Sequence, residues 1–347
     1  MLLPFTDRRV LLTGAGGSIG SALARQIVGQ KPRRLVLLDH SEGNLYQLGV
    51  LLSEAVEPEG YSLRLGDVCD ESLLGEILEE ERPEIVLHAA AFKHVPLMES
   101  NVIAAARNNA LGTNLLARMA ARNGLEAVVM ISTDKAVGPR SVMGATKRVA
   151  ELGLLRWSNP RTRMRAVRLG NVVGSQGSVV PAFLQQIAAG GPVTVAHEDA
   201  ERFFFSMEET VELIVLATLL AGESGIYIPQ PREAVRILDL AKKLILEHGQ
   251  GRKITIGITG LRPGDKLTEA FVSRDETVSD SSDAKLRLVH SPEPSREEFD
   301  AAIESLEQST AEREVASVLD VLCRLVPDYR PSQTALGIGL KQESNSR

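Results

Sequence analysis

Residues 9–20 read RVLLTGAGGSIG, a short apolar run followed by a glycine-rich turn. Gly14 permits a tight turn, Gly17 lets the backbone approach a pyrophosphate, and Gly20 allows a helix to pack closely on the strand. A helix that begins near Ser18 would offer its free N–H groups and its dipole to that anion. The alternative is a turn that merely ends a strand, but the strand–turn–helix context favours a dinucleotide site. The predicted contacts are Gly14, Gly17, Ser18, Ile19 and Gly20.

Apolar, β-branched runs recur after this turn, separated from one another by about one helix length. Their apolarity is continuous rather than alternating, which is typical of strands buried on both faces of a parallel sheet that carries helices on either side. The sequence therefore predicts a doubly wound α/β fold of the Rossmann type. The expected strands are 9–14, 34–39, 62–67, 84–90, 127–132 and 165–171.

The pattern changes after Asn171, where segments rich in glycine and proline predict a smaller, discontinuous second lobe. Near the end of the chain, two Ser-x-x-Glu capping boxes, Ser295/Glu298 and Ser309/Glu312, predict two structural helices. The predicted boundaries are 1–175 and 206–250 for the Rossmann domain, 176–205 and 251–330 for the second lobe, and 331–347 for a disordered tail.

A carboxylate ends the second predicted strand, RLVLLD (34–39). Asp39 can accept hydrogen bonds from both ribose hydroxyls, whereas a 2′-phosphate at the same place would meet like charge. NAD is therefore favoured over NADP. Arg33, Arg34 or His40 could pair with a 2′-phosphate and reverse this preference, so the alternative stays open.

The bulk composition excludes several classes of protein. The net charge of −6, with no cluster of Lys and Arg, argues against a nucleic-acid partner. The two cysteines, Cys69 and Cys323, do not make a disulfide framework, and the histidines show no metal-binding spacing. The longest apolar stretch, residues 213–222, is too short to cross a bilayer. We expect a cytoplasmic protein with no metal, no nucleic acid and no membrane partner.

Several motifs follow one another in an order that resembles a known family: TGAGGSIGS (13–21), HAAAFKHVPLMES (88–100), ISTDKAVGP (131–139), MGATKRVAE (143–151) and GLRPGDKLTE (260–269). Together they resemble the CapD-like polysaccharide-biosynthesis group of nucleotide-sugar 4,6-dehydratases, in the extended short-chain dehydrogenase/reductase superfamily. Many members carry an N-terminal membrane region, and this chain resembles the short soluble form. The resemblance implies an internal redox cycle. NAD takes a hydride from sugar C4, a base removes the C5 proton, an acid protonates the leaving C6 hydroxyl, and the hydride returns to C6.

Thr133, Asp134 and Lys135 follow the fifth predicted strand, at the edge where doubly wound sheets bind ligands. In related dehydratases of glucose nucleotides, a Thr-Asp-Glu run supplies the acid and the base, and here Lys135 stands in place of the Glu. A lysine base would need its pKa lowered from ~10.4 to about 7–8. We expect Asp134 to act as the acid and Lys135 as the base. The alternative is an ion pair between neighbouring loop residues.

Met143 and Lys147 lie four residues apart on a predicted helix and therefore share one face. The superfamily commonly has Tyr where Met143 stands, and a thioether cannot exchange a proton. Lys147 can still hold the nicotinamide ribose. Met at this position is common in the CapD-like group, so it identifies a subfamily. The group that accepts the C4 hydroxyl proton stays open, with Thr133 together with Asp134, or a water, as candidates.

The remaining site residues are assigned from the motifs in which they stand. Asp67 and Val68 are placed to meet the adenine, although Asp67 could be a simple turn residue, and Asn109 could buttress the site from a helix. Two converging arginines could grip a diphosphate, since Arg binds phosphate in a bidentate manner. Further cofactor contacts are expected at His40, Ser41, Asn44, Asp67, Val68, Ala89, Ala90, Ala91, Lys93, Asn109 and Lys147. Substrate contacts are expected at Lys93, Thr133, Asn171, Val180, Arg202 and Arg262.

The resemblance implies an enzyme that dehydrates UDP-N-acetylglucosamine with tightly bound NAD and that forms a homo-oligomer. It also implies that the Rossmann domain binds NAD and that the second lobe binds the nucleotide sugar and its substrate phosphates. A close alternative is a relative that also epimerises C5 or uses another nucleotide head group. A more distant alternative is a dinucleotide-binding sensor without catalysis, against which the Thr133–Lys135 run argues.

Overall fold

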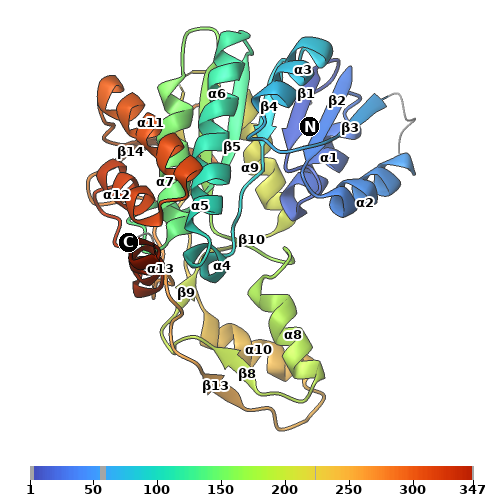
Figure 1. Cartoon of the computed structure of the whole chain (residues 1–347). Coiled ribbons are helices and arrows are strands. Elements are labelled where there is room, and N and C mark those ends of the chain that lie inside the picture. The colour runs from blue at the N-terminus through green and yellow to red at the C-terminus, as the bar shows by residue number, and fades with distance from the viewer. Residues whose placement is uncertain (1–3, 55–59, 223, 346–347) are drawn as a thin grey trace.

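The structure, a computed structural model, describes residues 4–54, 60–222 and 224–345. A large lobe is built around one sheet, and a smaller lobe lies beneath it (Figure 1). Parallel strands run in the order β3-β2-β1-β4-β5-β6-β11, and the antiparallel strands β15 and β14 extend the sheet beyond β11. The predicted doubly wound sheet is confirmed, with all six predicted strands in it. The strands are β1 (Arg9–Thr13), β2 (Arg34–Asp39), β3 (Tyr61–Leu65), β4 (Ile85–His88), β5 (Ala127–Thr133), β6 (Arg163–Leu169), β11 (Gly225–Pro229), β14 (Thr277–Asp280) and β15 (Leu286–His290).

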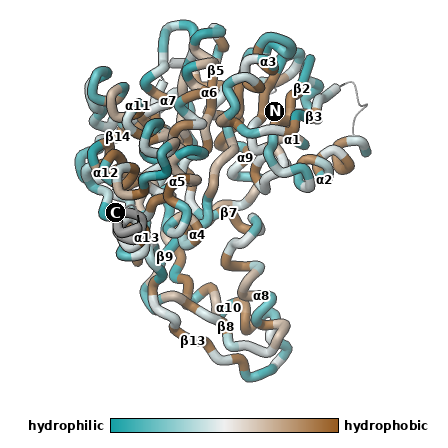
Figure 2. Tube along the Cα trace, viewed as in Figure 1, coloured by the Kyte–Doolittle hydropathy of each residue, from teal (hydrophilic) through white to brown (hydrophobic). Residues whose placement is uncertain are grey.

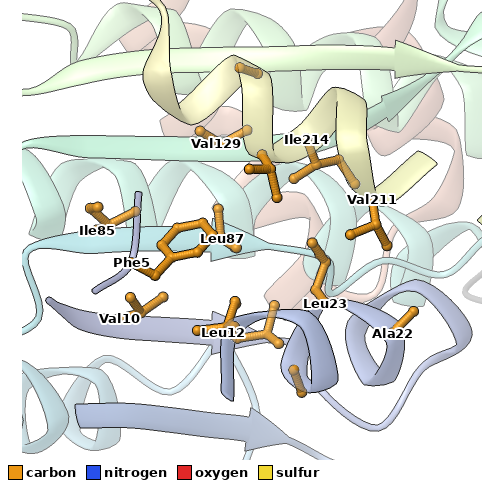
Figure 3. Packing of buried hydrophobic residues seen from close by; sticks show 14 of the residues in the cluster. Phe5, Val10, Leu12, Ala22, Leu23, Ile85, Leu87, Val129, Val211 and Ile214 are labelled. Carbon is orange, nitrogen blue, oxygen red and sulfur yellow. The ribbon is translucent and has the colours of Figure 1, made fainter. Parts of the chain in front are cut away.

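Apolar side chains leave the central strands toward both faces of the sheet. In β1, Val10 and Leu12 join one core and Leu11 joins the other, which is why the strand reads as a continuous apolar run. Figure 3 shows Val10 and Leu12 packed with Phe5, Leu23 of α1 and neighbouring residues. One face is covered by α1 (Ser18–Val28), α2 (Glu42–Ser53) and α9 (Met207–Leu219), and the other by α3 (Glu71–Glu81), α6 (Gly112–Arg122) and α7 (Val142–Arg156).

Two further helices, α11 (Arg296–Glu312) and α12 (Val315–Leu325), pack outside α7 and against α5 (Val102–Ala105) and the π-helical turn η2 (Ala106–Leu111). The capping box of Ser295 and Glu298 is confirmed at the start of α11. The second predicted box is wrong, because α11 continues through Ser309, whose hydroxyl donates to the Ser305 carbonyl. The next helix begins only at Val315.

The predicted disorder of residues 331–347 is also wrong for most of that segment, since α13 spans Gln333–Asn345. Ser332, just before α13, donates its hydroxyl to the buried carboxylate of Glu99, at the end of α4 (Val95–Glu99). Ala335 is fully buried in the cluster formed with α12. A buried acceptor and an apolar contact thus fix a segment whose composition alone suggested disorder.

The smaller lobe consists mainly of α8 (Val179–Ala188), β8 (Val193–Val195), α10 (Ile237–His248) and β13 (Ile256–Ile258). Its own core includes Phe183 and Ile187 of α8 and Ala241 and Leu244 of α10. In Figure 2, hydrophobic and hydrophilic segments alternate along α8 and α10, as expected for helices with one buried face.

The lobe boundaries differ from the predicted ones in two places. Residues 237–248, predicted for the large lobe, form α10 in the smaller lobe because the apolar stripe of this helix matches that of α8. Residues 277–325, predicted for the smaller lobe, instead supply β14, β15, α11 and α12 to the large lobe. Leu286 and Val289 of β15 are buried in the two cores of the main sheet, which accounts for this placement.

Candidate active site

A cleft of about 770 Å³ lies at the carboxyl ends of β1, β4, β5 and β6, between the two lobes. The order of strands reverses between β1 and β4, and such switch points bind ligands in doubly wound sheets. Most of the predicted site residues line this cleft. They are Gly14, Gly17, Ser18, Ile19, Gly20, Asp39, His40, Ser41, Asn44, Val68, Ala89, Ala90, Ala91, Lys93, Thr133, Lys135, Met143, Lys147, Asn171, Arg202 and Arg262.

The glycine turn forms a cradle that no side chain could share. Gly14 has φ +65°, and a Cβ added to it would lie 2.5 Å from the Ala90 nitrogen on β4's loop. A Cβ on Gly20 would lie 2.9 Å from both the Cα and the carbonyl oxygen of Ala15, and closer still to the Gly14 carbonyl. Gly17 is the N-cap of α1, and none of the side chains that the structure describes caps the helix there. Free N–H groups of a helix N-terminus therefore face the cleft beside an uncluttered backbone, which fits a dinucleotide pyrophosphate.

Asp39 is held rigidly at the end of β2. One carboxylate oxygen accepts from the Gly16 N–H at 2.8 Å and the other from the Ser41 N–H at 2.8 Å. Each oxygen keeps one lone pair for a ligand in the cleft. Arg34 begins the same strand and pairs with Glu81 at 2.8 Å, so it lies at the opposite end of β2. At about 3.3 Å per residue, that end is roughly 16 Å from Asp39.

Four predicted site residues do not line the cleft, namely Asn109, Asp67, Val180 and the buried Asp134, which is described below. Asn109 is fully buried and accepts from the Phe92 N–H at 2.8 Å while it donates to the Phe92 carbonyl, so it shapes the loop after β4 from behind. Asp67 accepts from the Cys69 N–H at 2.9 Å, which matches the turn role weighed as its alternative. Val180 packs against the core of the smaller lobe.

His88, a buried histidine that was not predicted from the sequence, forms hydrogen bonds next to the cleft, at the carboxyl edge of the sheet. His88 Nε2 lies 2.8 Å from the Thr113 hydroxyl, and Thr113 donates to the Asn109 carbonyl at 2.7 Å. Thr113 must therefore accept from His88, and His88 Nδ1 accepts from the hydroxyl of the cleft residue Thr13 at 2.7 Å. Burial lowers the pKa of His88 to about 3, with the charge of Lys147 adding to the effect, so the ring is neutral.

Thr133, Asp134 and Lys135 form a compact polar cluster where β5 passes into the short helical turn η3 (Asp134–Ala136). Asp134 has no exposed surface, and its Oδ1 accepts from the Thr133 hydroxyl at 3.0 Å and from Lys135 Nζ at 2.9 Å. Its Oδ2 is buried with no hydrogen-bond partner in the described part of the chain. Asp134 thus reaches the cleft only through Thr133 and Lys135.

Lys135 lies among several polar partners in this structure. Its Nζ donates to Asp134 Oδ1 at 2.9 Å and to Asn171 Oδ1 at 3.2 Å, and Glu269 Oε1 lies 3.5 Å away as an ion-pair partner. Burial by itself would lower the pKa of Lys135, but the charges of Asp134 and Glu269 outweigh burial and raise it above its ordinary value. The expected lowered pKa is therefore wrong for the free protein, because the second carboxylate was not foreseen.

Glu269 and Lys266, next to the cleft, are further residues that sequence reasoning missed. Both belong to the motif of residues 260–269, from which only Arg262 was assigned a role. Lys266 Nζ lies 3.3 Å from Glu269 Oε2 and donates to the Val137 carbonyl at 2.5 Å. The charge pattern Asp-Lys-x-x-Glu in GLRPGDKLTE was the available signal.

The two predicted diphosphate arginines differ in their environments. Arg202 donates to the carbonyls of Glu201, Lys266 and Leu267 at 2.7–3.0 Å, so its guanidinium is largely occupied in holding the segment that carries Glu269. Arg262 is far more exposed, and its Nε pairs with Asp265 at 2.8 Å. Of the two, only Arg262 has most of its donors available to a ligand.

Met143 and Lys147 lie one turn apart on α7, as predicted, and both are buried against the cleft. Lys147 Nζ donates to the Ile131 carbonyl at 2.8 Å. Burial lowers the pKa of Lys147 to about 8, against the opposing charge of Glu151. Glu151 itself accepts from Arg168 and from the Ser132 hydroxyl, which locks α7 onto β5 and β6.

The sheet order, the glycine cradle at β1 and the lysine of α7 define a Rossmann-type member of the extended short-chain dehydrogenase/reductase class. Solved structures agree. Pen from Bacillus thuringiensis superposes with a TM-score of 0.77 at 26% identity, covering 86% of this chain and 98% of Pen. DesIV, the dTDP-glucose 4,6-dehydratase of Streptomyces venezuelae, superposes with a TM-score of 0.64 at 21% identity over 75% of this chain and 87% of DesIV, and supports the fold alone.

Residues 10–290 match the family described as polysaccharide biosynthesis protein, and the chain belongs to that family. It is 43% identical to the capsular polysaccharide biosynthesis protein CapD of Staphylococcus aureus over 78% of this chain and 46% of CapD. It is 40% identical to the probable polysaccharide biosynthesis protein EpsC of Bacillus subtilis over 81% of this chain and 48% of EpsC. The chain thus spans about half the length of these two relatives.

A third relative, the UDP-N-acetylglucosamine 4,6-dehydratase (inverting) of Campylobacter jejuni serotype O:2, is 29% identical over 79% of this chain and 80% of its own length. Relatives of this chain thus include proteins named as a nucleotide-sugar 4,6-dehydratase and as UDP-glucose 4-epimerase. Across the described residues, no helix combines the length and the apolar character that crossing a membrane requires.

Proposed function

We propose that this protein catalyses the NAD-dependent 4,6-dehydration of UDP-N-acetylglucosamine, giving a UDP-4-keto-6-deoxy sugar for surface glycan synthesis. One observation carries the proposal. A dinucleotide cradle and Lys135, which pairs with the buried carboxylate of Asp134, lie in one cleft at the carboxyl edge of the sheet. The named dehydratase among the relatives supports this choice of reaction and substrate.

The cleft fits NAD at several points. The turn at Gly14, Gly17 and Gly20 would hold the pyrophosphate, Asp39 the adenosine ribose, and Lys147 the nicotinamide ribose. The chemistry that bound NAD supplies is acceptance of a hydride from sugar C4 and its return to C6, without net oxidation.

NAD is the proposed cofactor rather than NADP. A 2′-phosphate would meet the fixed carboxylate of Asp39, while Arg34, the cation weighed as its partner, is engaged with Glu81 at the far end of the strand. Arg33 precedes it and shares that location. His40, at the cleft rim with its ring against Phe92, is the one nearby group of the three that lies beside the ribose position.

Asp134 and Lys135 supply the acid and the base by sharing one proton. Transfer of a proton from Lys135 Nζ to Asp134 Oδ1 across their 2.9 Å hydrogen bond converts the ion pair into a neutral amine and a carboxylic acid, with no change in net charge. The amine can then remove the C5 proton. The acid can protonate the leaving C6 hydroxyl through the Thr133 hydroxyl, which bonds Asp134 and lines the cleft.

Met143 lines the same cleft and exchanges no proton. Because Asp134 takes its proton from Lys135, we propose that a water beside the Thr133 hydroxyl accepts the C4 hydroxyl proton. Asn171, Lys93 and Arg262 line the part of the cleft that is open to the sugar diphosphate. Arg202, predicted as a phosphate ligand, is assigned instead to holding residues 266–267.

The test is incubation of the purified protein with UDP-N-acetylglucosamine, followed by mass spectrometry and NMR of the product. Loss of one water with a 4-ketone and a C6 methyl group supports the proposal, and the C5 configuration distinguishes retention from the inversion named for the Campylobacter relative. A product of unchanged mass would identify an epimerase. Binding of nucleotide without any turnover would identify a sensor.

A further inference from the structure

Glu269 occupies an unusual position for a carboxylate that does not touch the cleft. Its side chain is only 2% exposed. One oxygen lies 3.5 Å from Lys135 Nζ and 3.8 Å from Arg202 Nε, and the other lies 3.3 Å from Lys266 Nζ. The carboxylate therefore sits among three cations in a site that water scarcely reaches.

The segment that carries Glu269 is fixed on both sides. Ahead of it, Arg202 donates to the carbonyls of Lys266 and Leu267. After it, the buried Arg168 of β6 donates to the Phe271 carbonyl at 2.8 Å and to both oxygens of Glu276 at 2.7 Å. Because Glu269 is held between these anchors, its distance to Lys135 is set by the fold and not by a flexible loop.

The charged groups that face Lys135 come from two sides. Asp134 belongs to its own turn, whereas Glu269, Lys266 and Arg202 come from the segments of the second lobe. Two carboxylates and two other cations thus surround the ammonium group, and Asn171 adds a neutral acceptor. Asp134 has to exchange a proton with Lys135 in the proposed reaction, so the charge of Asp134 changes during turnover. Glu269 is then the carboxylate beside Lys135 whose negative charge stays constant.

We propose that Glu269 is a positioning residue that sets the protonation state of Lys135 and so the pH range in which the Asp134–Lys135 pair can work. The catalytic consequence rests on the proposed dehydration. The effect on Lys135 itself does not, and it can be measured without substrate.

The reactivity of Lys135 toward trace acetic anhydride reports its fraction of free amine. Peptide mass spectrometry would follow acylation of Lys135 between pH 7 and 9, relative to the exposed Lys243 in the same molecule. An opposite charge at this distance changes a pKa by about 1–3, so Glu269→Gln should raise the relative reactivity of Lys135 about 10-fold or more.

Glu81→Gln is the matched control, because Glu81 is also a largely buried carboxylate that pairs with two cations, Arg34 and Arg64, but lies outside the segment that carries Glu269. It should leave the reactivity of Lys135 within about twofold of wild type while lowering the melting temperature. Glu269→Asp retains the charge but withdraws it by one methylene, and should give an intermediate reactivity. This variant decides the matter if Glu269→Gln does not fold.

In the dehydration assay, the limb of the pH profile that reports Lys135 should move to lower pH in Glu269→Gln and stay in place in Glu81→Gln. Unchanged reactivity of Lys135 in both Glu269 variants would overturn the inference, whatever the enzyme does. Raised reactivity without any dehydration of UDP-N-acetylglucosamine would leave the inference standing and remove the proposed function.

Discussion

Replacement of Gly20 by Ala tests the cradle on which cofactor binding depends. The added methyl would lie 2.9 Å from the Cα and the carbonyl oxygen of Ala15, and closer still to the Gly14 carbonyl. Ordinary contacts of a Cβ start near 3.4 Å, and all these neighbours are backbone atoms that no rotamer change can move. The turn and the start of α1 must therefore separate by several tenths of an ångström or more.

Overpacking of this kind costs about 1–3 kcal/mol, which corresponds to a fall of several degrees in melting temperature. The larger effect should be on the binding of NAD, because the displaced N–H groups at the start of α1 would no longer point toward one bound pyrophosphate. We expect copurified NAD to fall at least about tenfold, measured by extracting nucleotide from the denatured protein.

Gly43→Ala is the control for this change. Gly43 lies in the first turn of α2, and a Cβ there would meet nothing within 4 Å. This variant should retain its NAD and equal or exceed the stability of wild type by up to about 1 kcal/mol. Normal NAD content and an unchanged melting temperature in Gly20→Ala would refute the close-packed turn.

Four further predictions concern chemistry and acid stability. Lys135→Ala should abolish exchange of the C5 proton with deuterated water, and Asp134→Asn should slow loss of the C6 hydroxyl by about 10²–10⁴-fold, both measured by NMR of product formed in D₂O. Met143→Leu should change kcat less than about threefold, since neither side chain carries a proton; a loss as large as that of Lys135→Ala would reveal an unassigned role for the thioether. Asp39→Ser should lower the affinity for NAD and reduce the ratio of the NAD affinity to the NADP affinity, both measured by equilibrium binding. A wild-type protein that binds NADP more tightly than NAD would contradict the assignment. The pKa of His88 in the folded protein, about 3, lies below its ordinary value of 6.5. Below about pH 6.5 the unfolded chain therefore binds a proton at His88 that the folded protein does not bind. The free energy of unfolding, measured by denaturant titration, should fall as the pH drops below about 6.5.

The sheet and the cradle could be predicted because their signals are local. Continuous apolar runs identify strands buried on both faces, and the spacing of Gly14, Gly17 and Gly20 places a helix N-terminus beside a strand. Asp39 and Lys147 follow from their positions relative to those elements. In each case the evidence lies within a short stretch of chain whose local conformation it determines.

Sequence patterns could not identify residues whose role depends on contacts with residues far away in the sequence. Glu269 approaches Lys135 only because Arg202 and Arg168 fix the segment around it, and none of these contacts leaves a periodic pattern. The same limit applies to Asn109, whose bonds to the Phe92 backbone fit its predicted role as a buttress, whereas its predicted contact with the cofactor does not fit its place behind the cleft lining. It also explains the misplaced lobe boundaries, since α10 joins whichever lobe offers a complementary apolar face.

The internal redox cycle is the central claim, and the fate of the sugar C4 hydrogen tests it most directly. UDP-N-acetylglucosamine carrying deuterium at C4 should yield a 4-keto product with that deuterium in its C6 methyl group, while the bound cofactor ends as NAD. Recovery of the deuterium in released, reduced cofactor would contradict the account and identify a dehydrogenase. Return of the deuterium to C4 of a sugar that keeps its C6 hydroxyl would also contradict the account and identify an epimerase.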